Sequence, residues 1–217
     1  MDERVDIFLE NYREQMPGFL SDIEKHAREH NIPVMSKRTG DVIRYTLHTI
    51  EPSSVLEIGT AVGFSALFMK TCVSPQTRIT TIEKIKARYS QAEVNFSRYD
   101  KEHQIELIKE DASEAIERFK SEGKRYQFIF LDAAKAQYSA FLPTLIELLE
   151  TGGVLISDNV LHHGVVMSSR YAVSNRDRTI HERLRKYLKE VSSHPMLETL
   201  ILPIDDGITI SRKLGKQ

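Results

Sequence analysis

From residue 53 onward, short apolar runs alternate with longer stretches in which apolar residues recur at helical spacing. Several of the runs are almost continuously apolar, which is typical of strands that helices cover on both faces. The intervening segments, such as 84–99 and 137–149, suit crossover helices between parallel strands. The expected strands are 54–58, 78–82, 105–109, 128–132, 154–158, 200–203 and 208–211.

The last two runs break this alternation. Only the four residues IDDG separate 200–203 from 208–211, which is too short for a crossover helix. The two strands are therefore expected to pair antiparallel through a turn at Asp206 and Gly207. The pattern predicts an α/β fold: a doubly wound, mostly parallel seven-stranded sheet with an antiparallel C-terminal hairpin.

The first fifty residues indicate helices instead. Apolar residues form a loose face on the first helix: Ile7, Leu9 and Tyr12. The sequence SDIE at 21–24 has the pattern of a capping box that opens a second helix. This helix should end before Pro33, because proline disfavours helical backbone in the residue before it. A third helix is expected over 39–50, and the N-terminal helices together with the hairpin edge predict a homodimer.

Composition narrows the class of protein. The 217 residues contain no repeat and no Pro/Gly/Ser-rich linker, which predicts a single domain with a helical cap (1–50) and a sheet core (53–212). Lys plus Arg (30) balance Asp plus Glu (31), so the net charge of −1 gives no overall attraction to nucleic acid or membranes. A lone cysteine (Cys72), an acidic start and the lack of an apolar run of about 18 residues predict a cytoplasmic protein without a membrane span.

The carboxyl ends of the strands are the first place to look for a site, because ligands of doubly wound sheets bind there. The first strand runs into Gly59 and Gly63, and a helix should begin near Phe64. Glycine allows a tight turn and close approach of a ligand, and a helix N-terminus offers free N–H groups. Glu83 ends the second strand 24 residues after Gly59, close to the spacing of about 20 residues that suits a ribose-binding carboxylate. A nucleoside site is predicted, with a purely structural turn as the alternative.

The glycine pattern departs from that of a dinucleotide-binding turn. A G-x-G-x-x-G motif has glycines where this chain has Ala61 and Phe64. S-adenosylmethionine carries no phosphate, and an acidic neighbour such as Glu57 can help its ammonium group, directly or through structure. The turn therefore favours S-adenosylmethionine, with a dinucleotide-binding or non-catalytic domain as the alternative.

Asp111 follows the third strand and precedes Ala112 at the expected start of a helix. Its residue type and position are those of a helix N-cap. Because the third strand lies beside the expected ribose site, the turn formed by Asp111 and Ala112 is also a candidate for an adenine contact.

The strongest chemical signals lie in LDAAKAQY (131–138) and SDNV (157–160). Asp132 ends the fourth strand, and Asp158 and Asn159 end the fifth, so neighbouring strands bring them to one rim. Two carboxylates and an amide oxygen, with room for water, suit Mg²⁺; without a cation the carboxylates would repel each other. Lys135 is a candidate general base at the same place. The alternative is that the carboxylates are unrelated cap or loop residues and that Lys135 is a solvated charge.

These motifs carry a resemblance to a known family. VLEIGTAVGFSA, Glu83, the turn at Asp111 and Ala112, DAAKAQY and SDNV occur in this order in the class I S-adenosylmethionine-dependent O-methyltransferases of the catechol and caffeoyl-CoA type. The chain resembles them over residues 30–212. The resemblance implies the terminal hairpin and a divalent-metal-assisted transfer of a methyl group to a hydroxyl.

The resemblance also implies roles for individual residues. Asp132, Asp158 and Asn159 would hold Mg²⁺, and Asp132 and Lys135 would be catalytic, with Lys135 as the base. The cofactor site would be formed by Met35, Gly59, Ser65, Glu83, Asp111 and Ala112, with Glu57, Gly63 and Asp132 beside them.

Within the family, the chain is similar to bacterial tRNA 5-hydroxyuridine methyltransferases, which make 5-methoxyuridine at the wobble position. The strings that carry this similarity are NIPVM, DAAKAQY, DNVLHHG and PIDDGITIS. The resemblance implies a tRNA anticodon loop as the partner. DNVLHHG differs from the tryptophan-bearing string of the plant phenylpropanoid enzymes, and the chain has no Trp, which argues against a phenol pocket walled by indole. A pocket or structural role is preferred for His162 and His163 over metal binding.

A basic segment bears on the choice of substrate. Arg170, Arg176 and Arg178 follow the fifth strand, with Tyr171 available to stack on a base. Cationic and aromatic side chains recognise the phosphates and unstacked bases of an RNA loop, so these three arginines are candidates for RNA contact. The remaining cations of 183–189 alternate with an apolar helical stripe and are interpreted as its solvated face. A small catechol-like substrate is the alternative, because catechol and 5-hydroxyuridine both present two adjacent oxygens to a metal.

Overall fold

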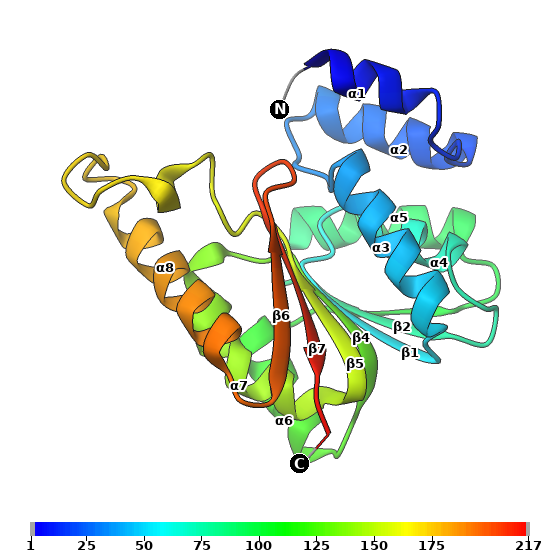
Figure 1. The fold of residues 1–217 in the computed structure, drawn as a ribbon. Coiled ribbons are helices and arrows are strands. Elements are labelled where there is room, and N and C mark those ends of the chain that lie inside the picture. The colour runs from blue at the N-terminus through cyan, green and yellow to red at the C-terminus, as the bar shows by residue number, and fades with distance from the viewer. Residues whose placement is uncertain (1–2, 216–217) are drawn as a thin grey trace.

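The computed structural model describes residues 3–215, which form a seven-stranded sheet with helices on both faces (Figure 1). The strands are β1 (Ser54–Ile58), β2 (Arg78–Ile82), β3 (Ile105–Ile108), β4 (Tyr126–Leu131), β5 (Leu149–Ser157), β6 (Leu197–Leu202) and β7 (Ile208–Lys213). The helices are α1 (Glu3–Glu10), α2 (Gly18–Glu29), α3 (Lys37–Ile50), α4 (Phe64–Thr71), α5 (Lys86–Tyr99), α6 (Ala112–Ser121), α7 (Tyr138–Leu148) and α8 (Arg178–Ser193), with short 3₁₀ helices at Lys135–Gln137 and Val165–Met167. None of these helices is long and apolar enough to cross a bilayer.

The five strands β1 to β5 run parallel, and the winding reverses between β1 and β4. The order across the sheet is β3-β2-β1-β4-β5-β7-β6. At the carboxyl end of β1, Ile58 stands between Ile82 of β2 and Leu131 of β4. A reversal of this kind sends the crossover helices to opposite faces and leaves a crevice outside the two central strands. The doubly wound fold predicted from the sequence is confirmed.

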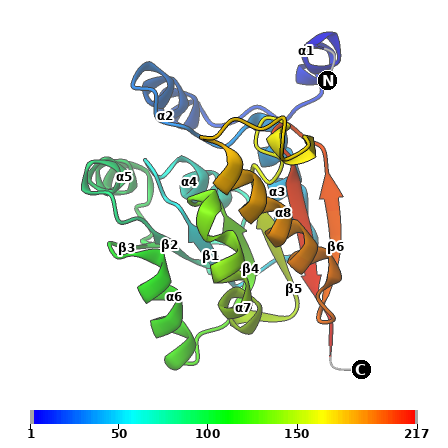
Figure 2. The same cartoon turned by 90° about the vertical axis from the view of Figure 1, so that its left-hand side faces the viewer.

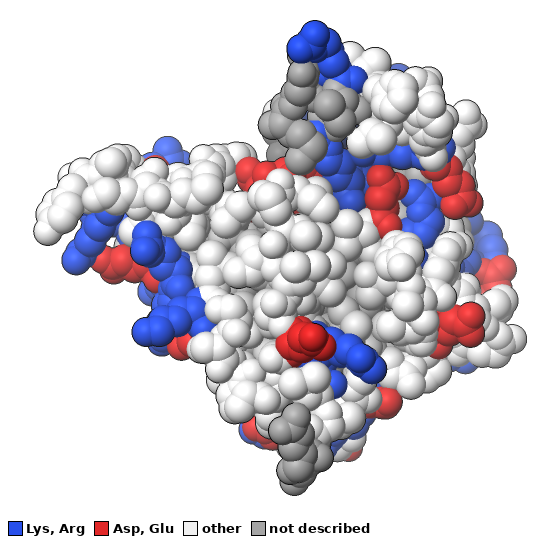
Figure 3. All heavy atoms as spheres, in the orientation of Figure 1, with Lys and Arg blue, Asp and Glu red and all other residues white. Residues whose placement is uncertain are grey.

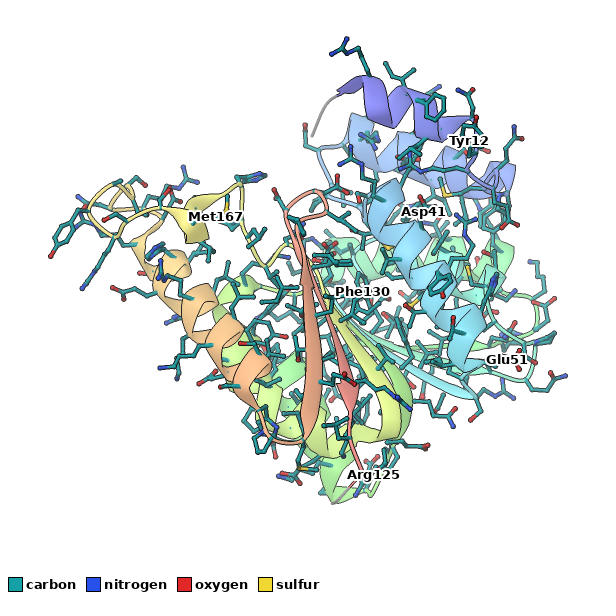
Figure 4. The ribbon with its side chains drawn as sticks, viewed as in Figure 1. Tyr12, Asp41, Glu51, Arg125, Phe130 and Met167 are labelled. Atoms are coloured by element: carbon teal, nitrogen blue, oxygen red, sulfur yellow. The ribbon has the colours of Figure 1, made fainter. Side chains whose placement is uncertain are left out.

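Each face of the sheet has its own helical layer. The helices α2 to α5 cover one face, and α6, α7 and α8 cover the other (Figures 1 and 2). Alternate residues of β4 divide between the two layers: Phe128 and Phe130 pack with the first, and Ile129 and Leu131 with the second. Phe130 accordingly lies in the interior of the molecule (Figure 4). Burial on both faces explains why this strand reads as a continuous apolar run.

The C-terminal hairpin is present as predicted. β6 and β7 pair antiparallel, and β7 also pairs antiparallel with β5. Because β7 runs against β5, the hairpin tip at 203–207 lies at the same edge of the sheet as the carboxyl end of β5. This places the tip beside the expected site.

The apolar runs identify the strands but not their full length. β5 begins at Leu149 rather than at 154, and β6 begins at Leu197 rather than at 200. Residues 150–153 of β5 are half-buried or exposed apart from Gly153, and in β6 only Leu197 is buried. Backbone pairing extends these strands beyond the segment that the apolar pattern marks.

The start of the second helix differs from the prediction. α2 begins at Gly18 after Pro17, so Ser21 lies inside the helix and is not its cap. The backbone N–H of Leu20 already donates to the carbonyl of Pro17. Leu20 is fully buried, and the helix extends upstream to present it to the core. The capping-box prediction for 21–24 is therefore wrong.

The other helix boundaries near the N-terminus agree with expectation to within two residues. α2 ends at Glu29, before Pro33. α3 begins two residues earlier than predicted, because the Ser36 side chain caps it by accepting from the Thr39 N–H at 3.0 Å. Ser36 thus connects the segment after Pro33 to a rigid helix.

The apolar residues of α1 and the turn after it face outward. Ile7 is 65% exposed and Tyr12 is 73% exposed, and Tyr12 is seen at the outer side of the helical cap (Figure 4). Ion pairs hold this segment to α3: Lys37 Nζ lies 3.1 Å from Glu10 Oε1, and Arg13 Nε lies 2.7 Å from Asp41 Oδ2. The apolar face predicted from the sequence exists, but no other part of residues 3–215 covers it.

Candidate active site

A cavity of about 790 Å³ lies at the carboxyl edge of the sheet, over the point where the winding reverses. It is lined by the ends of the parallel strands and by the tip of the C-terminal hairpin. Eight residues expected from the sequence lie on its wall: Gly59, Glu83, Asp111, Ala112, Asp132, Lys135, Asp158 and Asn159. One cavity therefore brings together the expected cofactor residues and the expected metal residues.

The turn after β1 is shaped by Gly59. Its φ is +107°, and a Cβ at this position would lie 2.0 Å from the carbonyl oxygen of Asp132. Any side chain would collide with backbone, so only glycine lets the turn pack against the end of β4. Gly63 has φ +83° and caps α4. Gly59 thus packs the turn directly against the backbone of Asp132.

Glu83 lies at the end of β2 with 7% of its surface exposed. Its carboxylate accepts hydrogen bonds from the backbone N–H of Ala61 at 3.1 Å and of Ile85 at 2.9 Å. These contacts hold a negative group on the cavity wall directly below the glycine turn. The position suits hydrogen bonds from two ribose hydroxyls, as expected from the sequence.

Asp111 is both a helix cap and a wall residue. Its side chain accepts from the Ser113 N–H at 2.9 Å, which confirms the N-cap of α6. Lys84 Nζ lies 2.9 Å from its other oxygen and lowers the pKa of this carboxyl. The N-cap and the adenine-contact interpretations are compatible, because Asp111 and Ala112 both line the cavity.

Four expected cofactor residues do not lie on this wall. Glu57, Gly63 and Ser65 are buried behind it, and Met35 lines a separate cavity of about 460 Å³ between the helical cap and α4. Of the neighbours of Met35 in the chain, Val34 lines the main cavity and Ser36 lines both cavities. The position of Met35 in the sequence does not reveal which cavity it lines, because packing sets the direction of each side chain.

Glu57 is fully buried beneath the turn, where Thr81 Oγ1 donates to its Oε2 at 2.5 Å. Burial raises the pKa of the Glu57 carboxyl to about 7, and hydrogen bonds from Ser65 and Thr81 offset part of that rise. The residue therefore acts through the packing of the turn rather than by standing in the cavity.

This burial predicts a pH-dependent stability difference for Glu57→Gln. The folded pKa of about 7 exceeds the ordinary value of 4.5, so the folded protein binds the extra proton between these values and loses stability as pH rises through that window. At about 1.4 kcal/mol per pKa unit, the variant should gain roughly 3 kcal/mol relative to the wild type between pH 4 and 8. Chemical denaturation at both pH values measures this. Glu29→Gln, on the exposed face of α2, is the control, and equal shifts in both variants contradict the prediction.

The expected metal ligands lie on adjacent strand ends. Asp158 follows β5 and is 3% exposed, and Asp132 follows β4. Burial raises the pKa of the Asp158 carboxyl to about 7, and the charge of Asp132 contributes to the rise. The Asn159 N–H donates to Asp158 Oδ1 at 2.8 Å, and Asn159 has a left-handed backbone with φ +54°. Two carboxylates on adjacent strand ends, one of them buried, form a donor set that fits a divalent cation.

The amide of Asn159 is needed to complete this set. Among residues 3–215, no three His, Cys, Asp or Glu side chains form a metal-binding group by themselves. A cation at this rim would be held by two carboxylates and one amide oxygen, with water in the remaining positions. That composition matches the preference of Mg²⁺ for oxygen ligands and retained water.

Lys135 stands beside the carboxylates. Its Nζ lies 2.8 Å from Asp132 Oδ1 and 5.5 Å from the centre of the Tyr138 ring. The 3₁₀ helix at Lys135–Gln137 turns this side chain back toward the strand end. The amine thereby faces the same space as the expected metal ligands.

Tyr138 ties the two strand ends together from below. It is fully buried, and its hydroxyl lies 3.1 Å from the carbonyl oxygen of Leu131 and 3.0 Å from that of Asp158. These carbonyls belong to the ends of β4 and β5. The tyrosine of DAAKAQY thus helps to set the separation of Asp132 and Asp158.

The sequence interpretation did not include the hairpin tip among the site residues. Asp205 and Asp206 line the cavity together with His163. Asp205 accepts from Arg38 Nη1 at 3.0 Å and also from the Ser36 hydroxyl, which joins the tip to α3. The signal was present in the topology, because an antiparallel terminal hairpin puts its tip at the carboxyl edge of the sheet.

The basic segment lies outside the cavity, in the connection between β5 and α8 and at the first residue of α8. Arg170, Arg176 and Arg178 are exposed, and Tyr171 is 93% exposed. Arg170 Nη2 pairs with Glu182 at 2.8 Å. The cations of 183–189 line the outer side of α8, opposite buried Leu184 and Tyr187, as the sequence predicts. Lys and Arg gather along the edge of the molecule that α8 forms, whereas the central part of the same face is largely uncharged (Figure 3).

Comparison with known proteins places this geometry in context. The profile of the O-methyltransferase family matches residues 12–214. Tapetum-specific methyltransferase 1 of Arabidopsis thaliana is 29% identical over 166 residues, which cover 76% of this chain and 71% of that protein. The caffeoyl-CoA O-methyltransferase of Stellaria longipes is 26% identical over 200 residues, covering 90% and 83% of the two chains. The structure of an O-methyltransferase from Bacillus cereus in complex with SAH has a TM-score of 0.85 at 22% identity and covers 97% of each chain.

The sheet order, the terminal hairpin and the glycine turn at the reversal point are those of the Rossmann-like methyltransferase fold. The family profile extends over nearly all of the described residues. The chain belongs to the O-methyltransferase family, in its S-adenosylmethionine-dependent group of the caffeoyl-CoA type. The resemblance seen in the sequence is confirmed at this level.

Proposed function

We propose that the protein methylates 5-hydroxyuridine to 5-methoxyuridine at the wobble position of tRNA, with S-adenosylmethionine as donor and Mg²⁺ as cofactor. The observation that carries the methyl-transfer site is the single cavity shared by Gly59, Glu83 and the three expected metal ligands. S-adenosylmethionine would lie against the glycine turn, with its ribose at Glu83 and its adenine near Asp111 and Ala112.

The chemistry follows from how this chain orients the reactants. Transfer from a sulfonium needs an oxygen nucleophile in line with the methyl group at roughly 3–3.5 Å. Gly59 packs on the backbone of Asp132, so a donor bound at the glycine turn would lie beside the acceptor oxygen at the metal site. Asp132, Asp158 and Asn159 would hold Mg²⁺, which when bound lowers the pKa of an acceptor hydroxyl. Lys135, at the edge of the same site, accepts the hydroxyl proton as general base.

The substrate class rests on the basic segment. Tyr171 and the three arginines lie between Asn159 and the first residue of α8, downstream of the expected metal ligands. Within residues 3–215, neither Arg176 nor Arg178 forms an ion pair, whereas Arg170 pairs with Glu182. Exposed aromatic and cationic groups of this kind suit the unstacked bases and phosphates of an anticodon loop. A tRNA substrate also places the protein in the cytoplasm.

A small catechol-like substrate is the second candidate. It is favoured by the relatives named as caffeoyl-CoA O-methyltransferases. Both candidate substrates present two adjacent oxygens to the metal site, so the metal ligands do not distinguish them. The rates of methylation do. Purified protein should methylate tRNA containing 5-hydroxyuridine faster than 3,4-dihydroxybenzoate, and a chelator should stop the reaction. Faster methylation of the catechol would reverse the assignment.

The role of the basic segment is tested by charge reversal. Arg176→Glu with Arg178→Glu should raise KM for tRNA by about tenfold or more and reduce its salt dependence, because phosphate contacts are lost. S-adenosylmethionine affinity should be unchanged. Lys124→Glu with Arg125→Glu makes the same charge change as a control. These residues precede β4, at the amino ends of the parallel strands and away from the cavity. An unchanged KM in the first variant removes the basic segment from the proposal.

We also propose a homodimer. Ile7, Phe8, Leu9 and Tyr12 are between 42% and 73% exposed on and just after α1, and this apolar face suits a second copy of the chain. Light scattering on the purified protein tests the assembly, and Phe8→Glu should shift the mass toward that of one chain. A mass of one chain for the unaltered protein at micromolar concentration would exclude the dimer.

A further inference from the structure

The loop after β5 wraps around the hairpin tip. The N–H of Val160 donates to the Gly207 carbonyl at 2.9 Å, and that of Leu161 donates to the Asp206 carbonyl at 2.7 Å. A Cβ on Gly207 would lie 2.3 Å from Leu161 Cγ, so the contact leaves room for glycine alone. Loop and tip therefore form one packed unit at the cavity rim.

Three residues of the loop have unusual backbone conformations. Asn159, His162 and His163 all have positive φ, between +44° and +54°. Non-glycine residues in this region are uncommon and collect at functional sites, where the surrounding structure holds them. Two of the three line the cavity, namely Asn159 and His163, whereas His162 does not.

Asp206 orients the ring of His163. Its Oδ1 accepts from the His163 backbone N–H at 3.2 Å and lies 3.0 Å from ring Nδ1. Because a carboxylate accepts hydrogen bonds and does not donate them, Asp206 favours the neutral tautomer of His163 that has its proton on Nδ1. In the neutral ring, Nε2 is then left as a hydrogen-bond acceptor. His163 belongs to no metal-binding cluster of His, Cys, Asp or Glu within residues 3–215.

We infer that His163, held by Asp206, is a specificity-determining residue that accepts a hydrogen bond from an N–H on the edge of the substrate ring. The inference rests on the proposed function. In 5-hydroxyuracil the two adjacent oxygens are O5 and O4, and the next group along the ring edge is N3–H, a donor. A catechol has a C–H at the corresponding place. An acceptor on the wall that carries Asn159 therefore favours the nucleobase over the phenol.

The test compares two RNA hairpins of anticodon-loop sequence that carry either 5-hydroxyuridine or its N3-methyl derivative. For the wild type, kcat/KM should fall by about tenfold to a hundredfold when N3–H is replaced, because the acceptor loses its partner. His163→Ala should lose a similar factor on the first hairpin and should discriminate little between the two. Its loss of rate with 3,4-dihydroxybenzoate should be clearly smaller than its loss with the first hairpin, because a catechol has no N–H at this place.

Two variants make the result specific. His162→Ala removes the neighbouring imidazole, which does not line the cavity, and should retain the preference of the wild type. Asp206→Asn keeps His163 but loosens its orientation, so it should lose part of the preference. S-adenosylmethionine affinity, measured by calorimetry, should be equal in all variants.

The outcomes separate the inference from the proposed function. If the wild type methylates the first hairpin and His163→Ala does so equally well, the inference is overturned and the tRNA assignment stands. An equal loss on RNA and catechol also overturns it, because that result marks a general effect on the site. If the wild type methylates neither hairpin, the proposed function and the inference both fall.

Discussion

Asp158→Ala should reduce methyl transfer by about 10³-fold or more, the largest effect expected for a single side chain here. Asp158 is 3% exposed and faces Asp132 across the ends of two parallel strands. Removing it takes away one of the two carboxylates that fit a divalent cation. Calorimetric titration with Mn²⁺ should show loss of binding in the variant, and methyl-transfer assays with and without added Mg²⁺ measure the rate.

Three comparisons make this result specific to the metal site. Asp158→Asn keeps an oxygen ligand but not its charge, so it should retain weak metal binding and an intermediate rate. Asp22→Ala, on the exposed side of α2, makes the same chemical change far from the cavity and should leave activity intact. S-adenosylmethionine affinity should survive in all three variants. Full activity of the wild type in excess chelator would refute the metal assignment.

Lys135→Met should lower kcat by about 10²- to 10⁴-fold, the usual contribution of a general base. The side chain stands 2.8 Å from Asp132 and lines the cavity. Because methionine removes a cation that competes for the Asp132 carboxylate, metal affinity should be kept or rise. Single-turnover kinetics with saturating donor and metal isolate the chemical step from binding.

Lys135→Arg distinguishes a base from a simple positive charge. Arginine keeps the charge but does not give up its proton in proteins, so it should not restore the rate. Lys25→Met on the exposed face of α2 is the matched control for loss of a lysine. Activity close to the wild-type value in Lys135→Arg would show that this position supplies charge alone, and another proton acceptor would then be required.

Much of the fold was predictable because its signals are local. Apolar runs marked the positions of all seven strands. The runs are nearly continuous in β1, β4 and the inner part of β5, because helices cover these strands on both faces. The four-residue gap before Ile208 excluded a crossover and predicted the hairpin. Asp132 and Asp158 were predicted to meet because parallel strands end at one edge. Each inference used the spacing of apolar residues or the length of a connection. Both can be determined from consecutive residues of the sequence.

Other features depend on contacts between distant segments. The start of α2 follows from the burial of Leu20 against the core, which outweighs the capping pattern at 21–24. Met35 lines a cavity other than the main one, and Glu57 is buried beneath the turn, because packing sets the direction of each side chain. No local pattern contains that information.

The local pattern thus accounts for the doubly wound sheet, the hairpin and the residue types at the strand ends. Folding adds the partners that tune those residues. Asp206 orients His163 across 43 positions of sequence, and Asp205 reaches Ser36 across 169. The raised pKa of Asp158 likewise arises from burial and from the charge on a neighbouring strand. The hydrophobic period and the residue preferences of turns depend on residues that are close in the sequence. Burial and electrostatic interactions depend on residues that are close in space. The effects of burial and charge are therefore decided only when the strands are assembled.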